Sequence, residues 1–299
     1  MHEYNHILVV VDFRQDEHFA LPRALKLASK LGSEVTIVST AYESFIDFIP
    51  SASAIDRRTI KEESLKLNTN HLKALVDELD IDGIEINYHS IWSSSIHTGL
   101  CHYIKENDFD LVAKTVRSHN ALEKLLFTPT DWHLLRDTDT DILFVKNDRW
   151  PSSTNILGAI NIDGDEAHVE LNKKIIQTTV ALAEICGSKA NVLNVFPWPI
   201  VQFEKFSHLF DGKDLFLEIQ KEHKTAVNEF VQSVAKINGK VVVAEGLEPE
   251  ETLPEMVQST RSELLVMGSV GRKGIKAAMI GNTAEKILDE IECEVLVLK

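Results

Sequence analysis

The sequence predicts an α/β protein made of two consecutive domains, each a parallel β-sheet with helices on both faces. Short β-branched and apolar runs alternate with stretches of helical spacing throughout the 299 residues. The pattern of the first half returns in the second half. A polar segment at 147–154, which contains a proline, separates the two. We therefore expect domains at residues 1–148 and 154–299, each large enough to bury its own core.

The elements of the first half follow from hydrophobic periodicity. Apolar residues recur on one face of each expected helix, and Gly32 is expected to end the first of them. The expected strands are 6–12, 35–40, 84–91, 111–114 and 142–146. The expected helices are 19–31, 59–79, 97–106 and 122–135.

The second half repeats this order of elements. Residues 110–146 align without a gap with 263–299 at a constant offset of 153, and the apolar pattern agrees along that length. The strand expected at 155–161 corresponds to residues 5–12, and the alignment matches Asn161 with Asp12. An internal duplication explains both correspondences.

A loop rich in glycine lies between the strand expected at 264–267 and a helix expected from Thr283 onward. Strand, glycine loop and helix start in this order can direct several backbone N–H groups at one anion, and phosphate is the obvious candidate. The glycines are Gly268, Gly271, Gly274 and Gly281. The duplicated copy carries Thr115, Ser118, Ala121 and Thr128 instead, with Pro129 opposite Asn282. We therefore expect the second domain to bind a phosphate-containing ligand and the first to be degenerate.

Composition narrows the class of protein. A formal net charge of −15 gives no overall attraction for nucleic acid or anionic lipid. No apolar run is long enough to insert into a membrane, and the first residues do not resemble a signal peptide, so we expect a cytoplasmic protein. Three widely spaced cysteines indicate reduced thiols in the core.

No catalytic or metal-binding constellation is evident. The sequence contains neither a nucleophile elbow nor a Gly-x-x-x-x-Gly-Lys-Ser/Thr loop, and no residue stands out as a positioned general base. His97 and Cys101 lie one helical turn apart and could contribute to a metal site, but a packing role explains them better because further ligands are not visible. We expect no enzyme and no metal site, with slow ATP hydrolysis as the remaining enzymatic alternative.

The motifs resemble those of the universal stress protein family, in its tandem, UspE-like form. Gly268, Gly271 and Gly281 match the Gly-x2-Gly-x9-Gly-Ser/Thr signature of the branch that binds ATP, except that Asn282 takes the Ser/Thr place. In the first half, the stretch 127–136, Phe-Thr-Pro-Thr-Asp-Trp-His-Leu-Leu-Arg, is similar to UspE proteins. The resemblance implies two adenine nucleotide α-hydrolase-like domains with strand order 3-2-1-4-5. It also implies an intramolecular pseudo-dimer in which 142–146 pairs with 295–298.

The resemblance also implies which residues bind ATP. Asn161 replaces the family's first-strand aspartate, and Asp163 lies on the same side of an extended strand. Val195 corresponds to the residue that meets adenine through its backbone, and Arg272 to a basic position that could neutralise phosphate. The phosphates would be cradled by backbone N–H groups, with Mg²⁺ as a bridging ion. The complete expected nucleotide site is Asn161, Asp163, Val195, Gly268, Gly271, Arg272, Gly281, Asn282 and Thr283.

Three further features of the sequence have mainly structural interpretations. Asn282 and Glu285 form a capping-box-like pair at the start of the helix that follows the loop. Asp12 is interpreted as a polar residue at a strand end, because its own loop is degenerate. Seven aromatic residues between Phe196 and Phe230 are interpreted as core packing, with a cavity for an apolar or lipid-like ligand as the alternative.

Overall fold

The structure is a computed structural model that describes most of the chain. The residues described are 4–50, 56–77, 79, 81, 83–117, 125–149, 154–162, 166–197, 212–246, 248–269 and 280–299. The cluster of glycines at 271–274 lies outside this set, as do Asp163 and Arg272.

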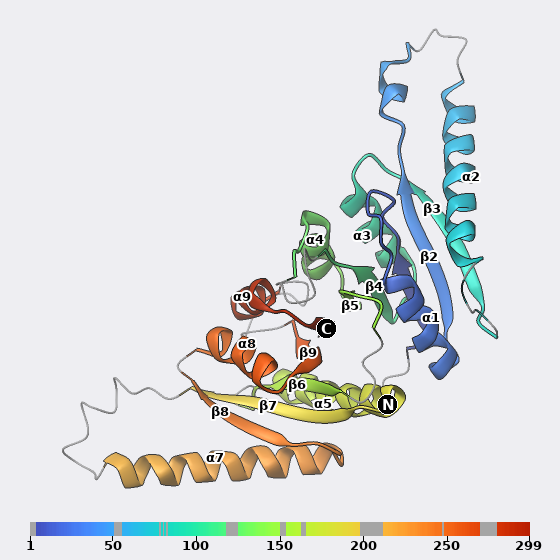
Figure 1. Cartoon of the computed structure of the whole chain (residues 1–299). Coiled ribbons are helices and arrows are strands. Elements are labelled where there is room, and N and C mark those ends of the chain that lie inside the picture. Colours follow the sequence, from blue (N-terminus) through green and yellow to red (C-terminus); the bar gives the residue numbers. More distant parts are fainter. Residues whose placement is uncertain are drawn as a thin grey trace.

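The first half alternates strands and helices as expected (Figure 1). Its strands are β1 His6–Val10, β2 Glu34–Ala41, β3 Ile86–Trp92, β4 Leu111–Thr115 and β5 Asp141–Val145. Its helices are α1 Ala20–Leu31, the short 3₁₀ helix η1 Ser44–Phe48, α2 Arg57–Val76, α3 Ile96–Glu106 and α4 Pro129–Asp137. Gly32 ends α1 in the left-handed conformation (φ 74°), where a residue without a Cβ is favoured.

The second half repeats the alternation. Its strands are β6 Asn155–Ile160, β7 Lys189–Pro197, β8 Val241–Gly246, β9 Ser262–Gly268 and β10 Glu294–Leu298. Its described helices are α5 Glu166–Cys186, α7 Gly212–Val234, α8 Pro249–Ser259 and α9 Asn282–Glu290. The duplication is confirmed, because α9 and β10 have the bounds of α4 and β5 shifted by the predicted 153 residues.

All ten strands form one sheet in the order β3-β2-β1-β4-β5-β10-β9-β6-β7-β8. Each half therefore has the expected order 3-2-1-4-5, and neighbours within a half are parallel. The halves join where β5 and β10 pair antiparallel, with Leu143 opposite Leu296. These two leucines are equivalent under the duplication, so an approximate twofold axis passes between them. The predicted intramolecular pseudo-dimer is confirmed.

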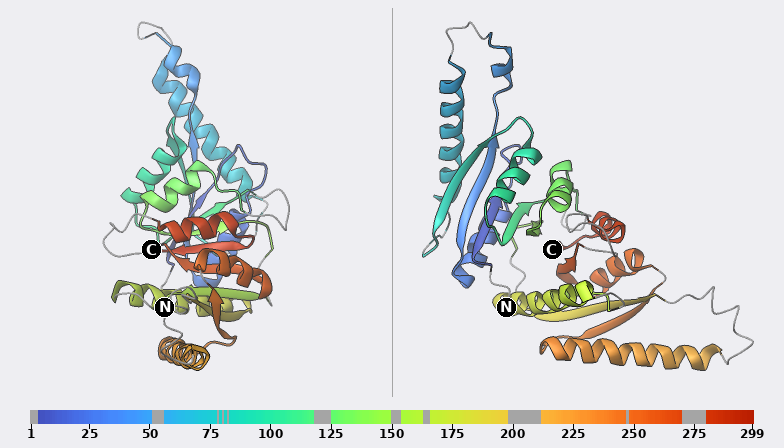
Figure 2. Two further views of the ribbon diagram at one scale, coloured as in Figure 1. Left: turned by 90° about the vertical axis from the view of Figure 1, so that its left-hand side faces the viewer. Right: turned by 180° about the vertical axis from the view of Figure 1, so that it is seen from behind.

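Helices cover both faces of the sheet, as Figure 2 shows from two sides. One face is packed by α1, α2, α5 and α7, and the other by α3, α4, α8 and α9. Alternation along the strands supplies both cores: Ile7 and Val9 belong to the first, Leu8 and Val10 to the second. Strands buried on both faces explain the continuous apolar runs in the sequence.

Two ion pairs with buried carboxylates hold the halves together near the twofold axis. Glu294 of β10 pairs with Arg23 of α1, and both side chains are nearly inaccessible. Asp141 of β5, the equivalent of Glu294, lies 2.7 Å from Nζ of Lys174 on α5. Each carboxylate also accepts a hydrogen bond from the backbone N–H that follows the partner fifth strand. Each half therefore supplies a cation to a buried acid of the other.

One predicted helix begins later than expected. We predicted helix over 122–135, but the described residues 125–128 are not helical and α4 begins at Pro129. Proline is favoured at the first helical position because its fixed φ suits the helix and its missing N–H is not needed there. Thr128 caps this helix in a capping box with Asp131.

Candidate functional site

The expected nucleotide residues lie at the carboxyl edge of the second half of the sheet. Asn161 follows β6, Val195 lies near the end of β7 and Gly268 ends β9. Because β6 is parallel to both β7 and β9, these strand ends share one edge. Ligands of open α/β sheets bind at this edge, where the strand order reverses. Asp163, Gly271 and Arg272 lie outside the described residues.

The first turn of α9 forms the remaining described part of the site. The Gly281 N–H donates to the carbonyl of Ser269 at 2.9 Å, which holds the helix start beside the end of β9. The expectation that the Gly281 N–H faces a phosphate therefore needs revision. The first intrahelical bond is donated by Glu285. The N–H groups of Asn282, Thr283 and Ala284 thus find no acceptor in the described part of the chain.

The residue whose carbonyl holds the helix start, Ser269, also has a buried hydroxyl. Ser269 is 1% exposed, and its Oγ has no hydrogen-bond partner among the described residues. A buried polar atom without a partner costs free energy, so a site that keeps one is a candidate for an additional ligand contact. Sequence reasoning did not select Ser269, although it directly follows Gly268.

The expected capping box at α9 is wrong. The N-cap is Gly281 (φ −73°, ψ 150°), and no side chain caps the helix. The Glu285 carboxylate instead binds Arg136 of α4, at 2.7 Å from Nη2. The motif was compatible with a capping box, but the other half of the molecule supplies a stronger, charged partner for Glu285.

Helix packing gives a separate reason for glycine at position 268. A Cβ added there would lie 2.5 Å from Cδ2 of Leu171 on α5. In the first half the equivalent residue is Thr115, whose Oγ1 accepts a hydrogen bond from the N–H of Ala20 at the start of α1. A larger residue at position 268 would therefore have to displace the Leu171 side chain, whether or not a phosphate approaches it.

Two further asparagines support the strand ends and were missed by sequence reasoning. Asn172 of α5 brackets Asn161, accepting from its N–H at 3.1 Å and donating to its carbonyl at 2.6 Å. Asn194, which is fully buried beside Val195, donates to the carbonyl of Ile160 at 3.1 Å. Neither asparagine belongs to a motif, so the sequence offered no signal for them. They fix the main chain from which Asn161 and Val195 extend.

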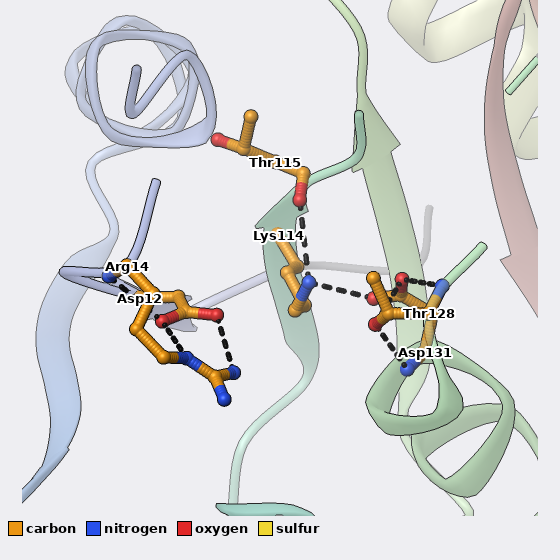
Figure 3. Close-up of polar contacts among 6 residues, drawn as sticks. All are labelled: Asp12, Arg14, Lys114, Thr115, Thr128 and Asp131. Carbon is orange, nitrogen blue, oxygen red and sulfur yellow. Dashed lines mark hydrogen bonds and ion pairs between the residues drawn. The ribbon is translucent and has the colours of Figure 1, made fainter. Parts of the chain in front are cut away.

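The equivalent place in the first half is occupied by charged side chains (Figure 3). Asp12, the counterpart of Asn161, accepts from the backbone N–H, Nε and Nη2 of Arg14. Burial raises the pKa of the Asp12 carboxyl, but the hydrogen bonds and charge of Arg14 lower it by more, so it lies below its usual value. This arrangement agrees with Asp12 as a strand-end residue. A small cavity of about 80 Å³ remains, lined in part by Asp12, Arg14, Thr40 and Lys114.

His97 and the aromatic residues between Phe196 and Phe230 were singled out in the sequence, and the structure places some of them. His97 stacks on His133 with ring centroids 3.9 Å apart, and the described residues contain no group of three potential metal ligands. Phe196 is buried and Phe230 packs against the core, which fits the packing interpretation for these two rings. The described residues do not include Trp198, Phe203, Phe206 and Phe210.

No helix in the described ranges has the length and apolar character needed to cross a membrane.

Comparisons with known proteins agree with this architecture. The family model for the universal stress protein family matches residues 3–146 and 162–299. Universal stress protein E of Escherichia coli K12 is 29% identical over 298 residues, covering 99% of this chain and 94% of that protein. The homolog from Haemophilus influenzae is 28% identical over 304 residues, with coverage of 99% and 98%.

A solved structure shows the same fold over the whole length. The putative universal stress protein from Pseudomonas aeruginosa UCBPP-PA14 superposes with a TM-score of 0.72 at 24% identity, covering 100% of this chain and 94% of that one. Two family matches in tandem, with similarity to the E-type proteins along nearly the full chain, make this protein a tandem, UspE-like member of the universal stress protein family.

Proposed function

We propose that the second domain, residues 154–299, binds ATP or a related nucleotide, and that the protein acts as a cytoplasmic sensor or regulator in the stress response. One observation carries the proposal. Three consecutive N–H groups at the start of α9, beginning at Asn282, lack acceptors in the described residues, and Ser269, whose carbonyl accepts the Gly281 N–H, carries a buried hydroxyl that also has no partner there. Such a set of fixed donors at a helix start suits a phosphate group.

The rest of the nucleotide would follow the edge of the sheet. Asn161 would offer hydrogen bonds without the charge of an aspartate, and the main chain at Val195 would meet the base. Gly271 and Arg272 would complete the phosphate cradle, and Mg²⁺ could bridge phosphate oxygens together with water. Hydrolysis, if it occurs, would be slow because no residue in the described part of the site takes the role of a positioned base.

Calorimetric titration with ATP and Mg²⁺ tests the proposal. Gly281→Val is the informative variant, because the φ and ψ of Gly281 are allowed for valine and the added methyl groups would crowd the helix start. We expect ATP affinity to fall at least about tenfold. Gly268→Val is unsuitable, since Leu171 would be displaced even without ligand.

The duplicated copy supplies the matched control. Thr128 is the N-cap of α4 as Gly281 is of α9, so Thr128→Val introduces the same side chain at the equivalent position of the first half. It should lower stability through loss of the cap but keep ATP affinity. Absence of heat with the unaltered protein would refute the proposal. An acyl compound extracted from that preparation would favour the apolar-ligand alternative.

The same variants decide the enzymatic alternative. Phosphate release from ATP that is well above background and disappears in Gly281→Val would show that the site is a slow ATPase. Release that persists in Gly281→Val would come from another site or a contaminant.

A further inference from the structure

The start of α4 in the first half is the duplicated counterpart of the proposed phosphate site. Both helices begin at the same position under the offset of 153, with Thr128 and Gly281 as their N-caps. At α9 the first N–H groups lack acceptors in the described residues, whereas at α4 a side chain of the same helix already lies against the helix start.

That side chain is Asp131, which is fully buried. Its Oδ2 accepts hydrogen bonds from the backbone N–H and from Oγ1 of Thr128, each at 2.7 Å. Its Oδ1 lies 2.7 Å from Nζ of Lys114 and takes part in this ion pair alone. The carboxylate is therefore an anion held at a helix start by a backbone donor, a hydroxyl and a cation (Figure 3).

Among the described residues, Asp131 is the carboxylate within ion-pair distance of Lys114, whose charge also contributes to lowering the pKa of Asp12. Lys114 is 2% exposed near the end of β4, and besides Asp131 its Nζ contacts only the carbonyl of Thr115, at 3.3 Å, among the described residues. The nearby carboxylate of Asp12 is held by Arg14. A buried ammonium is costly unless an anion compensates it.

The second half shows that the fold does not require this ion pair. Met267 stands at the position of Lys114 and Ala284 at that of Asp131, and both are buried. Cation and anion are thus present together in one copy and absent together in the other. The half that keeps the loop glycines has neither charge, and the half that lacks them has both.

We propose that the Asp131 carboxylate is an intramolecular anion of the first half, bound at the N-cap of α4 with Lys114 as its counter-charge, and that its negative charge keeps phosphate away from this helix start. The first half would then be closed to phosphate. A nucleotide would have access only to the second half.

Removing the internal anion should create an anion site that a small external carboxylate can fill. Asp131→Ala leaves Lys114 buried without compensation, and we expect its Tm to fall by about 5–10 °C. Sodium formate should raise the Tm of this variant by at least about 3 °C more than sodium chloride at equal ionic strength. The unaltered protein should show no such difference between the salts.

The chain's own second half provides the control. Lys114→Met combined with Asp131→Ala copies Met267 and Ala284, so the double variant should be more stable than Asp131→Ala and insensitive to formate. Absence of a formate effect in Asp131→Ala, or a double variant no more stable than the single one, would overturn the proposal. If Asp131→Ala does not fold, Asp131→Asn with and without Lys114→Met gives the same comparison. Because Tm is measured without nucleotide, failure here is distinguishable from failure of the proposed function.

Discussion

Arg136 of α4 and Glu285 of α9 link the two halves on the side of the proposed site. Nε and Nη2 of Arg136 donate to the same oxygen of Glu285, at 3.0 and 2.7 Å, and the guanidinium also lies over the ring of Trp132. Glu285 belongs to the first turn of the helix whose N–H groups would face a phosphate. Its negative charge opposes a phosphate there, and Arg136 offsets it.

This relationship predicts that the first half tunes nucleotide affinity in the second. Arg136→Gln should weaken ATP binding about two- to fivefold, and Glu285→Gln should strengthen it by a similar factor. Both side chains are partly exposed, so the effects should shrink at high salt. Calorimetric titration of the single variants and the double variant at two salt concentrations measures the coupling. Equal affinities in all four proteins would contradict it.

Gly268 should matter for stability independently of any ligand. Gly268→Val places Cβ against Leu171 and should lower the free energy of unfolding by about 1–3 kcal/mol. Leu171→Ala should recover part of that loss in Gly268→Val although it destabilises the unaltered protein. Urea unfolding of the four proteins checks this. Losses that simply add would show that Leu171 is not the obstacle.

The buried ion pair between Arg23 and Glu294, at the junction of the halves, should contribute far more to the free energy of unfolding than an exposed ion pair does. Glu294→Gln removes the carboxylate that pairs with the buried Arg23 guanidinium and should cost about 3–5 kcal/mol of stability. Glu62→Gln, which removes the partner of Arg58 on the exposed surface of α2, should leave unfolding unchanged. Denaturant unfolding compares the two variants. Equal midpoints would show that the buried pair contributes no more to stability than the exposed one.

The three thiols should be inert in the folded protein. Burial raises the pKa of Cys101 and Cys186 to about 11 and that of Cys293 to about 12. At pH 8 a thiol with such a pKa is ionised in only about one molecule in a thousand or fewer, and the thiolate is the reactive form. We expect no rapid reaction with a thiol reagent at pH 8 before unfolding, and three equivalents afterwards. Rapid labelling of native protein would show an open thiol.

The fold was predictable because each element carries its own signal. The β-branched runs, the stop at Gly32 and the repeat at constant offset depend on local sequence, and the structure reproduces them within a few residues. The late start of α4 was missed because apolar residues before Pro129 continue the helical spacing, while the proline and the Thr128 cap set the boundary.

The candidate site was predictable in position and less so in detail. Local spacing singled out Gly268 and Gly281, but it could not reveal that Gly268 faces Leu171 or that the Gly281 N–H is bonded to Ser269. Asn172 and Ser269 were missed because an isolated asparagine or serine has no periodic signature. Their importance comes from burial and from neighbours distant in sequence.

The sequence by itself determined the alternation of strands and helices, the duplication and the loss of the glycines from one copy, since these are properties of neighbouring residues and of the comparison between halves. Only the tertiary structure decided which charges meet. Glu285 turned from an expected cap to Arg136, and Lys114 and Asp131, two separate polar residues in the sequence, became one buried ion pair. Electrostatic energy depends on distance and burial, and both are fixed only when the chain has folded.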